Sequence, residues 1–336
     1  MHQAISDKDI IMNWGSAESY RMMLKSKNWK ANRAKGGCGQ QMISTVLVPA
    51  DFTIETEDLL GCIGELKNAG LKKVILLHVV DIHKSQGLAP MFERNAKERI
   101  EDYAGFAREL ELETETLVVL GDVRKTIAEI ADREDVDAII MGATTKGFIK
   151  GKLLGRTTEY IARSSKKILL VEKYEAMKEG KEVYEKACRA TFSKILVPLD
   201  FSKEAMKAIE QLQEFKEILN EVLFLHVIDD IKDMDLLDEQ REEAKEKLRR
   251  IKERLESIKS QYLVVEGIPS DEIVKFASIE DITLIMLTAR GEGALMDLLL
   301  GSTAENVLRK TTKPVLIIPA SKEFEGEEWD EGEEYA

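Results

Sequence analysis

The sequence predicts an α/β protein of two tandem domains, each built on a doubly wound, mostly parallel, Rossmann-like sheet. In each half, five short apolar strands alternate with segments of helical periodicity, and the first half recurs in the second with almost no insertion. A length of 336 residues also fits two domains of ordinary size. Strands joined by helix-length connections favour parallel βαβ units with right-handed crossovers.

The internal repeat is visible strand by strand. The run from Ser44 to Thr53 recurs as Lys194 to Ser202, and both contain Val-Pro-x-Asp-Phe. The run ending at Asp81 recurs as the run ending at Asp229, and both contain Leu-His-Val. The final strands of the halves, 167–171 and 314–318, also match. The chain is therefore a tandem duplication.

Helical periodicity predicts the segments between the strands. In the first half it predicts helices over Glu57–Ala69, Met91–Leu112 and Val123–Arg133. In the second half, Met234–Gln261 is expected to form one long helix, because Glu/Lys and Glu/Arg pairs recur at i,i+4 spacing on a solvated face.

The predicted organisation is a domain over residues 42–172, a charged, helix-like linker over 173–192 and a second domain over 193–320. Residues 1–41 hold seven Lys or Arg against three acids and show no apolar periodicity, so disorder or a loose helix is expected there. Because Met42 precedes the first strand directly, they are interpreted as an upstream extension, with a basic docking arm as the alternative. Residues 321–336 form an acidic tail with eight acids against one lysine.

Composition excludes several classes of protein. A net charge of −13 argues against a general nucleic-acid binder, and no apolar run is long enough for a membrane span. Three widely spaced cysteines have no metal-ligand spacing, so reduced thiols in a cytoplasm are expected. The sequence also lacks a Gly-x4-Gly-Lys-Ser/Thr loop and a Gly-x-Ser-x-Gly elbow. His78 and His226 are interpreted as packed structural histidines, with a catalytic base as the weaker alternative.

A phosphate site is predicted where the apolar run Asp281–Leu287 is followed by a glycine loop and a helix. Gly291 and Gly301 carry no Cβ, so the backbone can approach a ligand closely. The Ser302 hydroxyl and the first free amides of the helix could hold phosphate oxygens. The alternative needs no ligand, because Ser302-Thr-Ala-Glu305 is also a capping box.

An acidic residue ends the first strand of each half, at Asp51 and Asp200. In doubly wound sheets, ligands lie at the carboxyl ends of the strands where the strand order reverses. Such an Asp could accept hydrogen bonds from ribose hydroxyls while the glycine loop binds phosphates. The alternative is that both residues only cap the next helix, together with Thr53 and Ser202.

Both halves resemble the universal stress protein family over about 130 residues each. The resemblance rests on Val-Pro-x-Asp-Phe-Ser/Thr, Leu-His-Val-Val/Ile-Asp, the Gly-x2-Gly-x9-Gly-Ser/Thr loop and the closing Lys-Pro-Val-Leu-Ile-Ile. It implies an adenine-nucleotide-binding α/β domain with strand order 3-2-1-4-5, paired through its last strand. Some members bind ATP, whereas others lack the glycine motif and do not.

The loop of each half departs from the family pattern. Thr288 stands at the first glycine position of the second half, and Thr145 and Arg156 stand at the second glycine and the serine positions of the first. The Arg156 guanidinium could instead meet a phosphate, or it is simply solvated. The resemblance places adenine, ribose and phosphate contacts on Asp200, Val227, Thr288, Gly291, Gly301, Ser302 and Thr303, and a weaker set on Asp51, Val79, Gly142, Gly155 and Thr157.

These observations predict a cytoplasmic regulatory or stress-response protein that binds ATP or another adenine nucleotide, with or without Mg²⁺, mainly in the second half. No catalytic residues can be assembled from spacing, so an enzyme is not expected. The alternatives are a nucleotide-free dimerisation or scaffold protein and a slow ATPase. The expected partner is the nucleotide. The two domains are expected to pair with each other within the chain, and a homodimer is the alternative. Neither binding to nucleic acid nor a membrane span is expected.

Overall fold

A computed structural model of the chain describes residues 43–52, 60–85, 87–144, 154–176, 184–186, 190–229, 234–291 and 300–319. The expected extension 1–41 and acidic tail 321–336 lie outside these ranges, as do residues 177–183 and 187–189 of the linker. No helix among the described residues is both long enough and apolar enough to cross a membrane.

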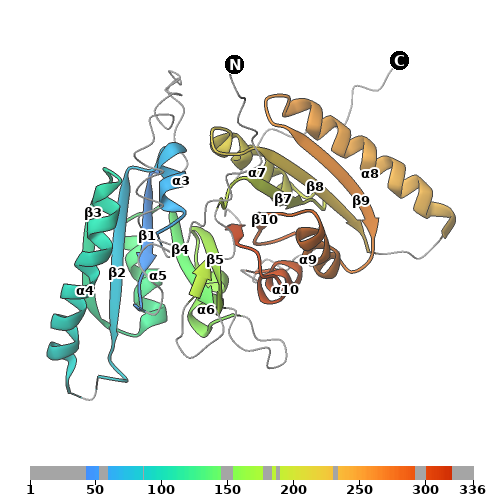
Figure 1. Ribbon diagram of the computed structural model, residues 1–336. Coiled ribbons are helices and arrows are strands. Elements are labelled where there is room, and N and C mark those ends of the chain that lie inside the picture. Colours follow the sequence, from blue (N-terminus) through green and yellow to red (C-terminus); the bar gives the residue numbers. More distant parts are fainter. Residues whose placement is uncertain are drawn as a thin grey trace, which may run out of the picture. The chain divides into compact units, whose positions relative to one another are not determined.

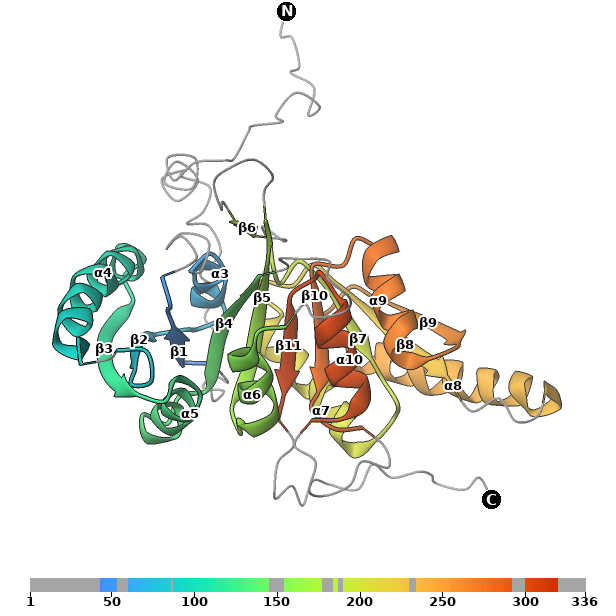
Figure 2. The same cartoon turned by 90° about the horizontal axis from the view of Figure 1, so that it is seen from below.

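The first half forms a five-stranded parallel sheet with strand order β3-β2-β1-β4-β5 (Figure 1). This is the predicted order 3-2-1-4-5. Figure 2 shows α3 and α4 on one face of these strands and α5 and α6 on the other, as in a doubly wound sheet. The elements of this half are β1 Thr45–Pro49, α3 Ile63–Asn68, β2 Lys73–Asp81, α4 Ala89–Glu109, β3 Glu113–Gly121, α5 Val123–Arg133, β4 Ala138–Thr144, α6 Arg156–Ser164 and β5 Ile168–Ala176.

The second half repeats this order as β9-β8-β7-β10-β11. Its strands at the centre of the sheet, β7 and β10, are apolar and buried, which explains why they appear in the sequence as unbroken apolar runs. The elements of this half are β7 Lys194–Pro198, α7 Lys203–Leu212, the 3-10 helix η2 Gln213–Phe215, β8 Glu221–Ile228, α8 Met234–Arg254, β9 Ser260–Glu266, α9 Pro269–Ile279, β10 Leu284–Thr288, α10 Ser302–Lys310 and β11 Val315–Ile318.

The last strands of the two halves pair with each other, as the sequence predicted. Strands β5 and β11 run antiparallel, with Leu170 opposite Leu316 and Val171 opposite Val315. The two parallel sheets therefore join into one continuous sheet, and each half covers an apolar edge strand of the other.

Two of the predicted elements are wrong. The long helix of the second half ends at Arg254, because residues 260–266 form β9 and pair with β8. The linker is not helix-like where it is described: β5 continues to Ala176 and the short strand β6, Tyr184–Lys186, pairs with it antiparallel. In both places, charged residues at helical spacing led to a prediction of helix, but pairing with a neighbouring strand outweighs local propensity.

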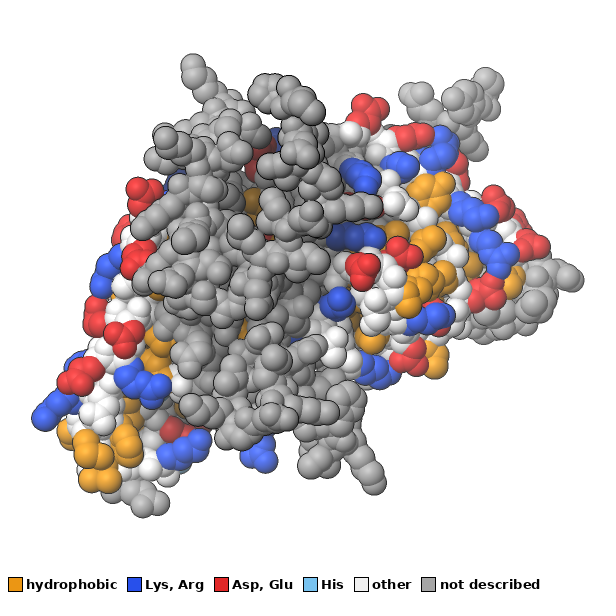
Figure 3. All heavy atoms as spheres, viewed as in Figure 1, with side chains coloured by type: hydrophobic (Ala, Val, Ile, Leu, Met, Phe, Trp, Pro, Cys, Tyr) orange, Lys and Arg blue, Asp and Glu red, His pale blue; other side chains and the backbone are white. Residues whose placement is uncertain are grey.

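Charged side chains of both signs are interspersed where side chains are coloured in Figure 3, along the left and right of the view. Apolar side chains gather on this face at the lower left, where α4 begins in Figure 1. Large apolar residues around the start of α4 remain exposed, namely Ile82, Leu88, Met91 and Phe92.

Candidate functional site

Asp200 follows the end of β7 and is held by the start of the next helix. The N-cap of α7 is Ser202, whose hydroxyl accepts a hydrogen bond from the amide of Ala205 at 3.1 Å. The same hydroxyl donates to Oδ1 of Asp200 at 2.6 Å, and the Ser202 amide donates to that oxygen at 3.0 Å. The expected alternative, a helix cap shared by Asp200 and Ser202, is therefore present, but it involves only one carboxylate oxygen.

The other carboxylate oxygen of Asp200 faces Gly291 in the glycine loop. A Cβ built on Gly291 would lie 2.2 Å from Oδ2 of Asp200, far closer than van der Waals contact permits. Glycine at position 291 thus leaves room for the Asp200 carboxylate, which would have to shift if residue 291 carried a Cβ. The neighbouring Thr288 also shapes the loop, because its hydroxyl donates to the carbonyl oxygen of Arg290 at 2.7 Å.

An aromatic stack borders Asp200 on the side of β8. Phe201 adopts a φ of 61°, in the left-handed region, and its ring lies 4.5 Å from that of His226. Nδ1 of His226 is 2.7 Å from the carbonyl oxygen of Leu199, which indicates a packed, hydrogen-bonded histidine. Lys247 of α8 lies over the Phe201 ring, with its Nζ 5.3 Å from the ring centroid.

The first half contains the same stack. Phe52 has a φ of 61° and stacks on His78 at a centroid distance of 4.4 Å. Arg99 of α4 lies over the Phe52 ring at 4.4 Å, as Lys247 does over Phe201. Burial lowers the pKa of His78. The two phenylalanines were not among the predicted site residues, although their recurrence directly after Asp51 and Asp200 is a signal that could have indicated a role.

The helix α10 begins one residue earlier than the capping-box interpretation requires. Its N-cap is Gly301. Ser302 is the first residue of the helix, and its side chain is exposed. Glu305 does not fold back onto the helix start, because Arg163 and Arg309 both donate to its carboxylate. The predicted capping box is therefore wrong. The first intrahelical hydrogen bond joins the Glu305 amide to the Gly301 carbonyl, so the amides of residues 302–304 precede the hydrogen-bonded ladder.

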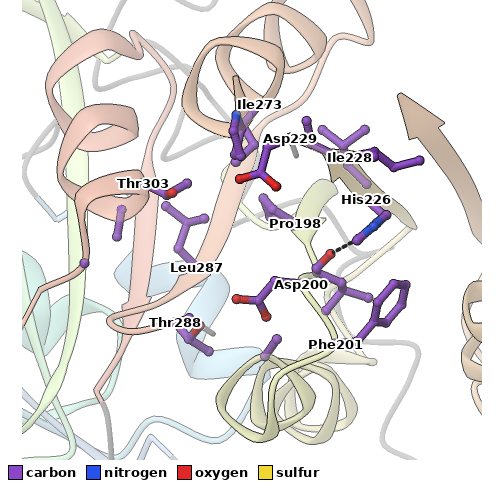
Figure 4. Close-up of a pocket in the computed structure, with 18 of the residues that line it drawn as sticks. Pro198, Asp200, Phe201, His226, Ile228, Asp229, Ile273, Leu287, Thr288 and Thr303 are labelled. Carbon is purple, nitrogen blue, oxygen red and sulfur yellow. Dashed lines mark hydrogen bonds between the residues drawn. The ribbon is translucent and has the colours of Figure 1, made fainter. Parts of the chain in front are cut away.

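These features surround one cavity of about 760 Å³ at the carboxyl ends of β7, β8 and β10. All seven residues predicted for the second half line it: Asp200, Val227, Thr288, Gly291, Gly301, Ser302 and Thr303. Figure 4 shows the carboxylates of Asp200 and Asp229 pointing into this space, with Thr303 across from them. Sequence reasoning missed further lining residues, namely Phe201, His226, Asp229, Gln240, Glu243, Lys247, Ile273 and Arg290.

The charges of the cavity are mixed. Asp200, Asp229 and Glu243 contribute negative charge, whereas Lys247 and Arg290 contribute positive charge. Nζ of Lys247 lies 2.8 Å from the Glu243 carboxylate, and this hydrogen bond lowers the pKa of Glu243. The carboxylates of Asp200 and Asp229 lie at the strand ends and that of Glu243 lies on α8, while the helix start at Ser302 offers amides and hydroxyls. The cavity thus has an acceptor-rich side and a donor-rich side.

The residues predicted for the first half lie at the corresponding places. Asp51 is exposed after β1, Val79 is half-buried in β2, and Gly142 lies within β4 opposite Glu172 of β5. Gly155 is the N-cap of α6, and Thr157 lies in its first turn. A Cβ on Gly155 would meet nothing closer than the Thr158 hydroxyl at 3.9 Å. The loop between β4 and α6, which includes Thr145, lies outside the described residues.

Over the described ranges, no group of three or more His, Cys, Asp or Glu side chains is placed to hold a metal ion.

Comparison with known proteins gives consistent matches to one family. The model of the family described as "Universal stress protein family" matches residues 42–173 and 191–319, together more than half of the chain. A universal stress protein of Methanocaldococcus jannaschii is 37% identical over 153 residues, which are 38% of this chain and 94% of that protein. A second one from the same organism is 31% identical over 143 residues, covering 39% of this chain and 84% of that protein.

Among solved structures, a universal stress protein from Archaeoglobus fulgidus covers 82% of this chain and 96% of its own length, with a TM-score of 0.61 at 24% identity. This likeness extends over both halves and concerns the fold. The two relatives from Methanocaldococcus jannaschii each correspond in length to a single half.

Proposed function

The chain belongs to the universal stress protein family, and from this premise we propose that its second half binds an adenine nucleotide, ATP above all, as a regulatory ligand in the cytoplasm. The proposed role is binding rather than catalysis. Bound nucleotide would alter the conformation of the chain or its contacts with other proteins in a stress response.

The observation that carries the proposal is the convergence of seven predicted residues on one cavity. They come from three separate parts of the sequence: Asp200 follows β7, Val227 lies in β8, and the others flank the loop between β10 and α10. The cavity volume of about 760 Å³ is in the range of small-molecule sites in proteins. It lies at the carboxyl ends of parallel strands, where doubly wound sheets bind nucleotides.

The two sides of the cavity suit the two ends of a nucleotide. The amides that open α10, the helix dipole and the Ser302 hydroxyl favour phosphate oxygens, with or without Mg²⁺. The carboxylate of Asp200 accepts hydrogen bonds, which suits ribose hydroxyls but not phosphates. Val227 and the apolar residues Leu287 and Ile273 provide a surface for the base.

We propose that the second half binds nucleotide more tightly than the first. The first half has Arg156 where the second has Ser302, and so lacks the hydroxyl that would meet a phosphate. Losing one hydrogen bond to a charged group costs about 1.5–3 kcal/mol, or roughly one to two powers of ten in affinity. The Arg156 guanidinium opposes this difference to the extent that it reaches a phosphate itself.

A scaffold function without nucleotide is the second candidate. It is favoured by the pairing of β5 with β11, which holds the halves together without a ligand, and by Gly291, whose lack of a side chain already serves Asp200.

Two experiments separate these functions. Small molecules released from freshly purified, heat-denatured protein are identified by chromatography, and ATP is titrated calorimetrically into wild type, Gly301→Val and Gly155→Val. We expect Gly301→Val to weaken binding at least about tenfold, because a branched side chain there crowds the Ala289 carbonyl, which already lies 3.4 Å from the position of a Cβ. The matched Gly155→Val change should leave the dominant site intact. The reverse pattern places the site in the first half, and absence of binding in wild type favours the scaffold.

A further inference from the structure

The helix α10 extends from the cavity of the second half to the contact between the two halves. Ser302 and Thr303, in its first turn, line the cavity. Arg309, near its other end, reaches the first half. Its nine residues span about 14 Å at 1.5 Å per residue. A hydrogen-bonded helix of this length moves largely as a rigid body, so a displacement of one end also displaces the other end.

Four charged side chains, two from α6 and two from α10, form a closed ring across the contact between the halves. Nη2 of Arg163 lies 2.6 Å from Oε1 of Glu305. Nη2 of Arg309 lies 2.5 Å from Oε1 of Glu159. Within each helix, Glu159 and Arg163 are 3.6 Å apart, and Glu305 and Arg309 are 3.1 Å apart. Each group therefore has two partners of opposite charge.

The ring follows from the duplication. Glu159 and Arg163 stand in α6 at the positions that Glu305 and Arg309 occupy in α10. Each glutamate thus contacts the arginine of the other half, as across a two-fold axis. The side chains of Arg309 and Glu159 are only 24% and 30% exposed, so solvent screens their attraction only in part.

A buried lysine ties α10 to the first half at a second point. Lys173 of β5 has no exposed surface, and its Nζ donates to the carbonyl oxygen of Leu308 at 2.8 Å. Leu308 lies in the last turn of α10, where carbonyl groups lack partners within the helix. The first half therefore holds three groups of α10: the Glu305 carboxylate, the Arg309 guanidinium and the Leu308 carbonyl oxygen.

We propose that α6 and β5 of the first half position α10 and thereby set the affinity of the second-half cavity for its anionic ligand. This inference rests on the proposed function, whose site it deepens. Donors at the start of α10 must be placed within about half an ångström to hold a ligand well. Because coupling free energies are reciprocal, a ligand at the helix start must in turn strengthen the contact between the halves.

The sequence differences between the halves agree with a first half that positions α10 and a second half that binds the ligand. The first half has Arg156 where the second has Ser302, so the end of the helix that faces the cavity has changed between the repeats. The residues at the contact between the halves, Glu159 and Arg163, have kept their types. The first half thus keeps what it needs to position α10, even where its own loop departs from the family pattern.

The test uses the full chain with the variant Arg163→Met, which removes one guanidinium of the ring without touching the cavity. The matched control is Arg133→Met, an arginine of α5 that pairs with Glu134 within the same half. With MgATP as the probe in titration calorimetry, we expect Arg163→Met to bind about 3- to 10-fold more weakly than the control. Glu159→Gln, which removes a partner of Arg309, serves as a second variant if Arg163→Met does not fold.

Two further measurements decide the proposal independently of affinity. In ligand-free protein, the NMR amide resonances of Ser302 and Thr303 should shift in Arg163→Met and stay in place in Arg133→Met. In wild type, MgATP should slow hydrogen exchange of the β11 amides, and it should do so less in Arg163→Met. Unmoved Ser302 and Thr303 resonances overturn the proposal, as does an ATP affinity equal to that of the control. If wild type binds no ATP, the proposed function fails, and the resonances alone decide whether α10 couples the two regions.

Discussion

The carboxylate of Asp200 occupies the space in which a side chain on Gly291 would begin. A Cβ at Gly291 would lie 2.2 Å from Oδ2 of Asp200, so the two residues can approach only because one of them is glycine. The carboxylate is held from its other side by Ser202, through bonds of 2.6 and 3.0 Å to Oδ1. The strand-end acid and the glycine loop, which are distant in sequence, thus form one unit of the cavity wall.

This relationship predicts the effect of Gly291→Ala. The added methyl group must displace the Asp200 carboxylate, which would then lose the hydrogen bonds to ribose hydroxyls that we propose for it. Loss of a hydrogen bond to a charged group predicts an ATP affinity lower by a factor of about ten or more, measured by titration calorimetry. Gly155→Ala is the control, because its Cβ would meet nothing closer than 3.9 Å. Equal affinities in the two variants would contradict the prediction.

Ser202 predicts a second effect on the same carboxylate. Ser202→Ala removes the N-cap of α7 and the hydroxyl that donates to Asp200. Loss of a serine cap lowers the free energy of unfolding by about 1 kcal/mol, and ATP affinity should fall as well because Asp200 loses a partner. Ser202→Thr keeps the hydroxyl and should restore both properties. Denaturant unfolding and calorimetry measure them separately; a Thr variant as weak as the Ala variant would rule out the role of the hydroxyl.

Much of this wall could be predicted from the sequence, and the reason is the duplication. Asp200, Gly291 and Ser302 stand at the ends of apolar runs that recur in both halves, so the strand order places them at one edge of the sheet. The stack of Phe201 on His226 and the position of Lys247 depend on how α8 packs, which local pattern does not encode. The burial of Lys173 could not be predicted either, because it depends on pairing between the last strands of the two halves.

Because the backbone of Phe201 is left-handed, we expect the usual order of stability between an Ala and a Gly variant to be reversed at this position. In ordinary positions Ala is more stable than Gly by about 0.5–1 kcal/mol. At a φ of 61°, however, a residue with a Cβ costs about 1–2 kcal/mol that Gly avoids. We therefore expect Phe201→Gly to be at least as stable as Phe201→Ala in denaturant unfolding, although both lose the stack on His226.

Phe276 provides the matched comparison, because it is half-buried within α9 and adopts no positive φ. There Phe276→Ala should be more stable than Phe276→Gly by about 1 kcal/mol. The same order of Ala and Gly at both positions would show that the left-handed backbone of Phe201 does not cause strain.

Lys173 predicts how the stability of the chain depends on pH. Its side chain is buried, and this burial lowers the pKa of its ammonium group to about 8, from an ordinary value of 10.5. Below pH 8 the lysine is protonated in both the folded and the unfolded state, so the folded state has the full cost of a buried charge. Between pH 8 and 10.5 the unfolded state holds a proton that the folded state has lost, and stability therefore rises with pH.

The variant Lys173→Met removes this dependence. At about 1.4 kcal/mol per pKa unit, the free energy of unfolding of the Met variant relative to wild type should fall by about 3 kcal/mol between pH 7 and pH 10.5. Urea unfolding at a series of pH values measures this difference, and titrations that the two proteins share cancel from it. Lys97→Met is the control for replacing a lysine by methionine, because that side chain is 61% exposed whereas Lys173 is buried. If the difference for Lys173→Met does not change with pH, then Lys173 keeps an ordinary pKa in the folded protein and contacts the Leu308 carbonyl in its charged form over most of this range.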